Sequence, residues 1–131
     1  MIVLDTHALV WWASGSKELS ARARAAIEHE CVDGQIVISA ISAWEIAMLV
    51  EREKLLLTMD VESWLSTIAE IDAVCFYPVD VDVSIKSIHL PGEFHKDPAD
   101  RMIVATARKL AAPVVTKDEK IRAYKHVTTV W

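Results

Sequence analysis

The stretch Ile2-Val3-Leu4-Asp5-Thr6 places three apolar residues directly before a carboxylate and a hydroxyl. Short apolar runs of this kind favour strands that are buried on both faces. Residues 36–38 and 114–116 repeat the pattern farther along the chain. Residues 74–79 form a further strand candidate that Pro78 closes, and residues 127–130 are expected to form an edge strand. The first stretch is therefore the first of five expected strands.

Helical segments separate these strands. Three residues are expected to cap helices that carry an apolar stripe: Ser20, Asp60 and Asp97. Ser42 is expected to cap the helix that carries Glu45, which places Glu45 at the third helical position. Residues 7–13 and 81–89 are predicted to be helical, and residues 117–124 a short helix or turn. Strands that alternate with helices indicate an α/β fold with a mostly parallel sheet and helices on both faces.

The composition indicates a globular chain. The chain has 131 residues, of which 53% are hydrophobic and 25% charged. No break in composition divides it, so we expect a single domain over residues 1–131. No apolar run approaches the roughly 18 residues that a membrane span needs. The first residues lack a basic n-region, so no signal peptide is expected. Cys31 and Cys75 have no local partners and are interpreted as free, mostly buried thiols in the reducing cytoplasm.

Four acids far apart in the sequence map to the carboxyl edge of the expected sheet. Asp5 follows the first strand and Asp118 the fourth, whereas Glu45 and Asp100 lie in first helical turns. Ligands of such sheets bind at this edge, so we expect the four carboxylates to converge. Converged carboxylates raise one another's pKa, which a cation relieves, and oxygen ligands select Mg²⁺ or Mn²⁺ for phosphate chemistry. Taken singly, each acid also fits a helix cap or a turn; taken together, they favour function.

The charge distribution bears on the partner. Residues 1–95 hold 6 basic and 15 acidic side chains, a net charge of −9, and residues 96–131 hold 8 and 4, a net charge of +4. A basic C-terminal third can contact phosphates while the rest of the surface stays acidic. On charge alone, the favoured interpretation of this basic segment is a solvated face of lysines.

Four segments resemble, in order, the acidic motifs of PIN-domain ribonucleases: residues 2–6 (IVLDT), 41–46 (ISAWEI), 95–103 (HKDPADRMI) and 115–118 (VTKD). In order, spacing and length, essentially the whole chain resembles the VapC toxins of bacterial and archaeal toxin–antitoxin pairs. The resemblance implies a PIN-like three-layer α/β/α sandwich. It also implies a Mg²⁺- or Mn²⁺-dependent ribonuclease that leaves a 3′-hydroxyl and a 5′-phosphate on RNA. As partners it implies a second copy in a homodimer and a VapB-like antitoxin that blocks the pocket.

The same resemblance suggests roles for residues. Asp5 and Asp100 match the firmest metal ligands, and Glu45 and Asp118 complete the catalytic pocket, partly through water. Thr116 matches a hydroxyl that orients an acid or a water.

Further residues beside the motifs are candidates for supporting roles. They include Thr6 of the first motif, and Asp97, which is more often a helix cap than a ligand. Arg101 can pair with a substrate phosphate or with a local acid. His95 can contact phosphate, although a lone loop histidine is more often solvated, and His7 stands where many relatives carry Asn.

Tryptophans suggest a surface for a partner. Trp11 and Trp12 are adjacent and cannot both enter one narrow stripe, so one of them is expected to be partly exposed. The resemblance makes Trp12, Trp44 and Met48 candidates for lining the groove that receives the antitoxin.

Three other interpretations compete. A haloacid-dehalogenase-like phosphatase needs a second Asp where the chain has His7, and a receiver domain needs an Asp where the strand at 36–38 is followed by Ser39. A PIN scaffold that binds RNA or a protein without cleavage is the third alternative, and the presence of all four acids argues against it.

Overall fold

The computed structural model describes residues 1–131 and contains one five-stranded sheet. The strands are β1 (Ile2–Leu4), β2 (Ile36–Ser39), β3 (Val74–Tyr77), β4 (Val114–Val115) and β5 (Thr129–Val130). Their order in the sheet is β3-β2-β1-β4-β5, and every neighbouring pair is parallel. The predicted parallel α/β fold is therefore confirmed, with β5 at an edge as expected.

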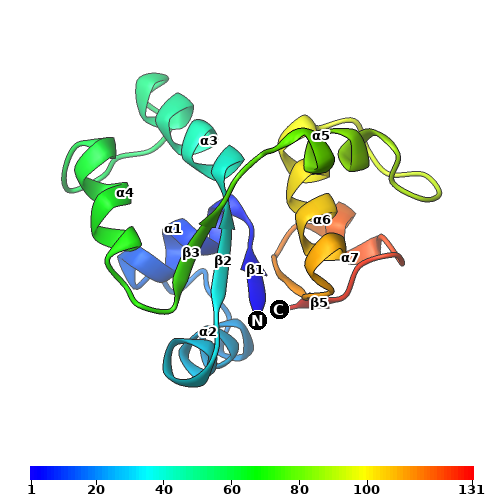
Figure 1. Cartoon of the computed structure of the whole chain (residues 1–131). Coiled ribbons are helices and arrows are strands. Elements are labelled where there is room, and N and C mark those ends of the chain that lie inside the picture. Colours follow the sequence, from blue (N-terminus) through cyan, green and yellow to red (C-terminus); the bar gives the residue numbers. More distant parts are fainter.

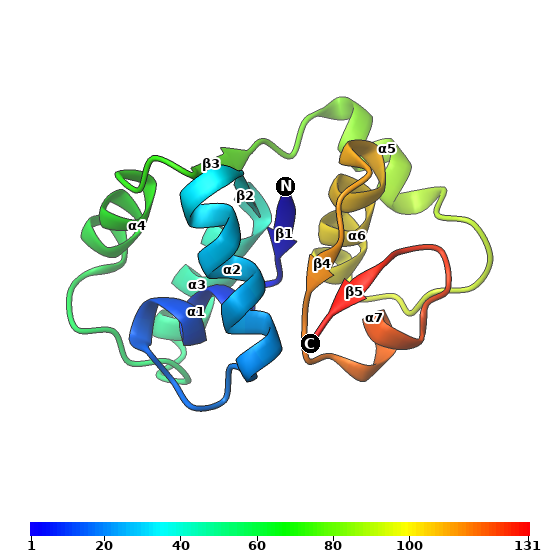
Figure 2. The ribbon, with the colours of Figure 1, turned by 90° about the horizontal axis from the view of Figure 1, so that it is seen from below.

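Seven helices connect the strands and cover both faces of the sheet (Figure 1). They are α1 (Thr6–Ser14), α2 (Ala21–Asp33), α3 (Ala40–Glu51), α4 (Val61–Ala69), α5 (Val81–Ile88), α6 (Pro98–Leu110) and α7 (Glu119–Ala123). Figure 2 shows α1, α2 and α4 on one side of the sheet and α5 and α6 on the other. This arrangement confirms the three-layer α/β/α sandwich. None of the helices combines the length and apolar character that crossing a membrane requires.

Alternate residues of each strand point to opposite faces of the sheet and pack into separate cores on the two sides. One face contributes five buried strand residues to the largest core: Ile2, Leu4, Ile36, Ile38 and Val115. That core includes Leu9 of α1 and Ile27 of α2. The other face presents Val3 and Val37, which pack with Ile103 of α6. Because successive strand residues point to opposite faces, a run of apolar residues is what a sheet covered on both sides requires.

The start of α3 differs from the prediction. Ser39, the last residue of β2, caps the helix, and its hydroxyl accepts a hydrogen bond from Ile41 N at 3.2 Å. The helix therefore begins three residues earlier than expected, without an intervening loop, because the strand residue itself supplies the capping hydroxyl. Glu45 consequently lies at the sixth helical position, beyond the first turn, and Ser42 is buried inside the helix.

Candidate active site

Asp5 lies where the strand order reverses. β1 is followed on one side by β2 and β3, and β4 and β5 lie on its other side, so the carboxyl ends of β1 and β4 flank the switch point at which α/β sheets bind ligands. Asp5 is only 7% exposed there. One carboxylate oxygen accepts a hydrogen bond from Ala8 N at 2.8 Å and thereby caps α1. The other accepts from the hydroxyl of Thr116, which directly follows β4.

Glu45 is held by the hydroxyl of Thr6, which in turn contacts the hydroxyl of Ser42. The Thr6 hydroxyl lies 2.5 Å from Glu45 Oε1 and 2.9 Å from the Ser42 hydroxyl. Because a hydroxyl carries one hydrogen, Thr6 donates to Glu45 and accepts from Ser42. The buried Ser42 thus supports the site through Thr6, whereas the sequence predicted Ser42 to be a helix cap.

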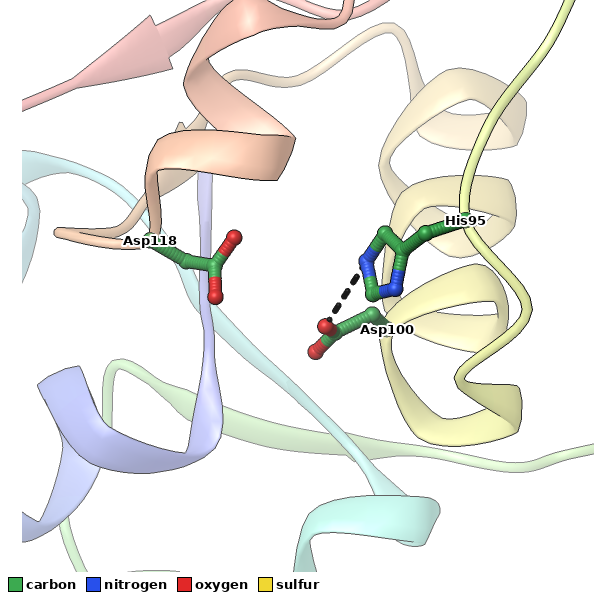
Figure 3. Close-up of side chains that lie close together, drawn as sticks. All are labelled: His95, Asp100 and Asp118. Atoms are coloured by element: carbon green, nitrogen blue, oxygen red, sulfur yellow. Dashed lines mark ion pairs between the residues drawn. The ribbon is translucent and has the colours of Figure 1, made fainter.

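Asp100 occupies the third position of α6, and Asp97 caps that helix by accepting a hydrogen bond from Asp100 N at 2.9 Å. His95 Nε2 approaches Asp100 Oδ2 to 3.0 Å, an ion-pair distance without hydrogen-bond geometry (Figure 3). Asp118 faces this pair from the start of α7, and ligand atoms of His95, Asp100 and Asp118 all lie within 4.8 Å of one another. The prediction that His95 is merely solvated is wrong, because the loop folds its ring against α6.

Asp118 has two functions in the structure. Its Oδ1 accepts hydrogen bonds from Lys120 N at 2.8 Å and Ile121 N at 3.1 Å, so it caps α7. Its own backbone N–H donates to the Thr116 hydroxyl at 3.0 Å. Thr116 therefore joins the carboxylate of Asp5 to the backbone of Asp118 through one oxygen atom.

These side chains surround one open cavity of about 590 Å³. Its lining contains six acids: Asp5, Glu45, Asp97, Asp100, Asp118 and Glu119. Lys117 also lines it, but its Nζ forms an ion pair with Glu18 at 2.9 Å and lies 5.7 Å from the centre of the Trp11 ring. The fold thus brings all four predicted acids to one place, with no lysine or arginine in an ion pair with any of them.

Burial and mutual repulsion make negative charge costly in this cavity. Burial raises the pKa of Asp100 to about 7, with further contributions from the charges of Asp97, Asp118, Glu45 and Asp5. Burial also raises the pKa of Asp5 despite the opposing hydrogen bonds from Thr116 and Ala8, and the pKa of Glu45 despite the hydrogen bond from Thr6. A cation in the cavity would relieve these shifts together.

The sequence of the whole chain is similar to that of one known protein family. The sequence model of the PIN domain matches residues 2–127. This chain belongs to the PIN domain family. It is also 38% identical over 133 residues to ribonuclease VapC22 of Mycobacterium tuberculosis, across 99% of this chain and 98% of that protein, which places it with the VapC ribonucleases. The phosphatase and receiver-domain alternatives are thereby excluded.

Solved structures share the fold of this PIN domain. The VapBC2 complex of Rickettsia felis, bound to a DNA fragment from its promoter, has a TM-score of 0.69 at 16% identity, over 98% of this chain and 97% of that one. The toxin VapC20 of Mycobacterium tuberculosis, described as cleaving the sarcin–ricin loop, has a TM-score of 0.64 at 14% identity, over 98% and 99%. At these identities the likeness shows the fold alone.

Arg101 does not line the acidic cavity of this PIN domain and forms no ion pair, so the predicted pairing with a local acid is wrong. Its guanidinium donates to four backbone carbonyls: Ser87 O, Ile88 O, Phe94 O and His95 O. The side chain thus fixes the loop between α5 and α6 and holds His95 beside Asp100. Nothing in the local sequence distinguishes a guanidinium that binds carbonyls from one that binds phosphate, because the difference depends on the path of a distant loop.

Proposed function

We propose that this PIN domain is an endoribonuclease that hydrolyses RNA phosphodiester bonds with a divalent cation held by Asp5, Glu45, Asp100 and Asp118. The observation that carries the proposal is the convergence of four carboxylates from different elements in one cavity, with no lysine or arginine in an ion pair with any of them. Such a site is stable at neutral pH when a cation balances the charge, and an anionic phosphodiester then becomes an acceptable ligand.

The donor set fits Mg²⁺ or Mn²⁺. The four side chains offer carboxylate oxygens, which hard divalent cations prefer, and no cysteine lines the cavity. Asp5 and Asp100 are the main ligands in this proposal, and Glu45 and Asp118 complete the set. A bound cation supplies Lewis-acid stabilisation of charge on the phosphate.

The chain's own residues hold the ligands in place. Thr116 orients the buried Asp5, and Thr6 orients Glu45 through the hydrogen bonds described above. Backbone amides of α7 fix one oxygen of Asp118. Partners of this kind keep ligand orientation, and their loss typically costs 10- to 100-fold in metal affinity or activity.

Cleavage of single-stranded RNA by the purified protein, with Mn²⁺ and with EDTA, tests the proposal. We expect Mn²⁺-dependent products with 3′-hydroxyl and 5′-phosphate ends, and their loss in Asp5→Asn and Asp100→Asn. Asparagine keeps size and, at position 5, capping ability, so the fold is retained. Asp72→Asn, at an exposed acid outside the cavity, is the matched control. Wild-type cleavage by Asp5→Asn in Mn²⁺ would show that the assigned site is wrong.

We further propose a VapB-like antitoxin as a partner of this chain. The related structures include a toxin–antitoxin complex from Klebsiella pneumoniae and DNA-bound VapBC from Salmonella typhimurium, besides the VapBC2 complex described above. The chain has an apolar groove between α1 and α4, lined by residues that include Trp12, Met59 and Trp64, and Trp44 is 58% exposed on α3. Co-expression with any short antitoxin-like reading frame found just upstream of the gene, followed by co-purification, tests the pairing. Trp44→Ala and Trp12→Ala are expected to weaken it.

A homodimer is proposed on the same basis. Val81, Ile85 and Ile88 form an exposed apolar stripe along α5, three and four residues apart. Sedimentation of wild type and Ile85→Glu tests whether this stripe is an interface, since a charge there is expected to favour the monomer.

A further inference from the structure

A second cavity, of about 480 Å³, lies between the loop at residues 92–95 and α7. Its lining differs in charge from the acidic cavity. It carries two lysines, Lys120 and Lys125, and two histidines, His95 and His126, against one acid, Glu93. Both lysines are exposed and neither forms an ion pair. The second cavity therefore offers unpaired positive charge to a polyanion.

The two cavities share a wall. His95 lines the second cavity, and its Nε2 lies 3.0 Å from Asp100 of the first. From His95 a row of rings leads away from the acids. Phe94 lies 4.4 Å from His95, Tyr124 lies 4.7 Å from Phe94, and His126 lies 5.3 Å from Tyr124, measured between ring centres. The second cavity thus begins beside Asp100 and is lined by π-faces and cationic groups, the pair of features that binds single-stranded nucleic acid.

The walls of this cavity are fixed before any ligand binds. The buried Tyr124 donates from its hydroxyl to Pro91 O at 2.5 Å and so ties the loop to α7. Arg101 holds Phe94 O and His95 O from the other side. Gly92 has a φ of +66°, a backbone conformation that favours glycine, so glycine suits the turn of the loop at this end. A site that is ordered in advance loses little entropy on binding.

We propose that the cavity between residues 92–95 and α7 binds a nucleotide of the RNA strand adjacent to the scissile phosphate. This inference rests on the proposed ribonuclease function. Lys120 and Lys125 contact the phosphates, and the base lies against Phe94 and His126, with the buried Tyr124 as the floor. The subsite positions the strand and selects the base beside the cut, and it takes no part in the chemical step.

Two measurements test the subsite. The first is binding of a short fluorescein-labelled single-stranded RNA of mixed sequence, in EDTA, as a function of salt. The second is steady-state cleavage of the same RNA in Mn²⁺. For Lys120→Ala/Lys125→Ala we expect binding weakened on the order of tenfold, with a salt slope reduced by about 2. In cleavage, KM should rise by a similar factor while kcat changes little. Arg52→Ala/Lys54→Ala removes the same charge from exposed positions after α3 and should match wild type.

Base selection is tested separately by sequencing the products from a randomised RNA pool. His126→Ala is expected to alter the base preference at one position beside the cut, with the melting temperature as a check on folding. If wild type cleaves and the lysine variant keeps the wild-type KM and salt slope, the subsite is wrong and the ribonuclease proposal stands. If wild type cleaves no RNA, the ribonuclease proposal fails, and equal binding by wild type and the lysine variant in EDTA overturns the subsite as well.

Discussion

The hydroxyl of Thr116 donates a hydrogen bond to the buried carboxylate of Asp5, although 111 residues separate them in the sequence. The same oxygen accepts the backbone N–H of Asp118 at 3.0 Å. One side chain therefore connects two proposed ligands across the point where the strand order reverses. The three residues act as one unit because any movement of β4 relative to β1 displaces both carboxylates.

Thr116→Val tests this unit. Valine has nearly the same shape but leaves one carboxylate oxygen of Asp5 and the Asp118 N–H without a partner. We expect the free energy of unfolding to fall by about 1–3 kcal/mol and cleavage to fall by about 10- to 100-fold. Thr116→Ser keeps the hydroxyl and should lose far less of both. Urea unfolding and initial cleavage rates measure the two effects, and equal activity of the valine and serine variants would contradict the linkage.

Asp100→Asn is expected to stabilise the metal-free protein while it abolishes cleavage. A carboxyl whose pKa rises from 3.8 to about 7 on folding binds its proton more tightly in the folded chain. The wild-type fold therefore loses stability as the pH rises from about 4 to about 7, because the unfolded state ionises first. Asparagine removes this loss. The difference in melting temperature in EDTA should grow across that interval and level off above it, whereas Asp72→Asn should show no such trend.

Mn²⁺ affinity is expected to depend on pH through the same carboxyl. Below pH 7 the ion must displace the Asp100 proton, so affinity should fall by about tenfold per pH unit, and above pH 7 it should level off. Calorimetric titration in buffers of different ionisation enthalpy measures both the affinity and the number of protons released. Affinity that stays constant between pH 5.5 and 8, two values chosen to bracket the pKa, would argue against Asp100 as a ligand.

Arg101→Lys is expected to destabilise the protein although it conserves charge. The guanidinium satisfies four carbonyls at once, and an ammonium cannot reproduce that planar fork. We expect a loss of about 2–3 kcal/mol in the free energy of unfolding and faster amide exchange in the loop between α5 and α6. Arg22→Lys, at an exposed position of α2, should change stability by less than about 0.5 kcal/mol. Similar losses in both variants would rule out a special role for Arg101.

Local signals account for what the sequence predicted well. Three apolar residues before Asp5 leave few alternatives to a buried strand, and Asp97-Pro98 carries a cap and a first-turn residue in sequence. The convergence of the acids follows from these elements and from the geometry of parallel sheets. Ser39 and Ser42 both suit a helix cap, and the choice between them depends on how far β2 pairs with β3, which is a long-range contact.

Loop residues illustrate the opposite case. His95 and Arg101 lie in or beside a segment without periodicity, and their contacts come from the way that the segment folds back over α6. The sequence shows which functional groups these two residues carry, but not which way their side chains point. Phe94 and Tyr124, near the basic segment, suggest base stacking from the sequence, but the cavity that they line depends on how residues 92–95 fold against residues 120–126.

Three of the acids that line the active-site cavity also begin helices: Asp5 for α1, Asp97 for α6 and Asp118 for α7. Three helix N-termini therefore point their partial positive charge toward the same space. The backbone thus acts as a built-in counter-ion that lessens the repulsion among the carboxylates. We expect this protein to fold first and capture its cation afterwards, unlike small zinc domains in which the metal drives folding. The supply of the ion would then control when the folded enzyme becomes active.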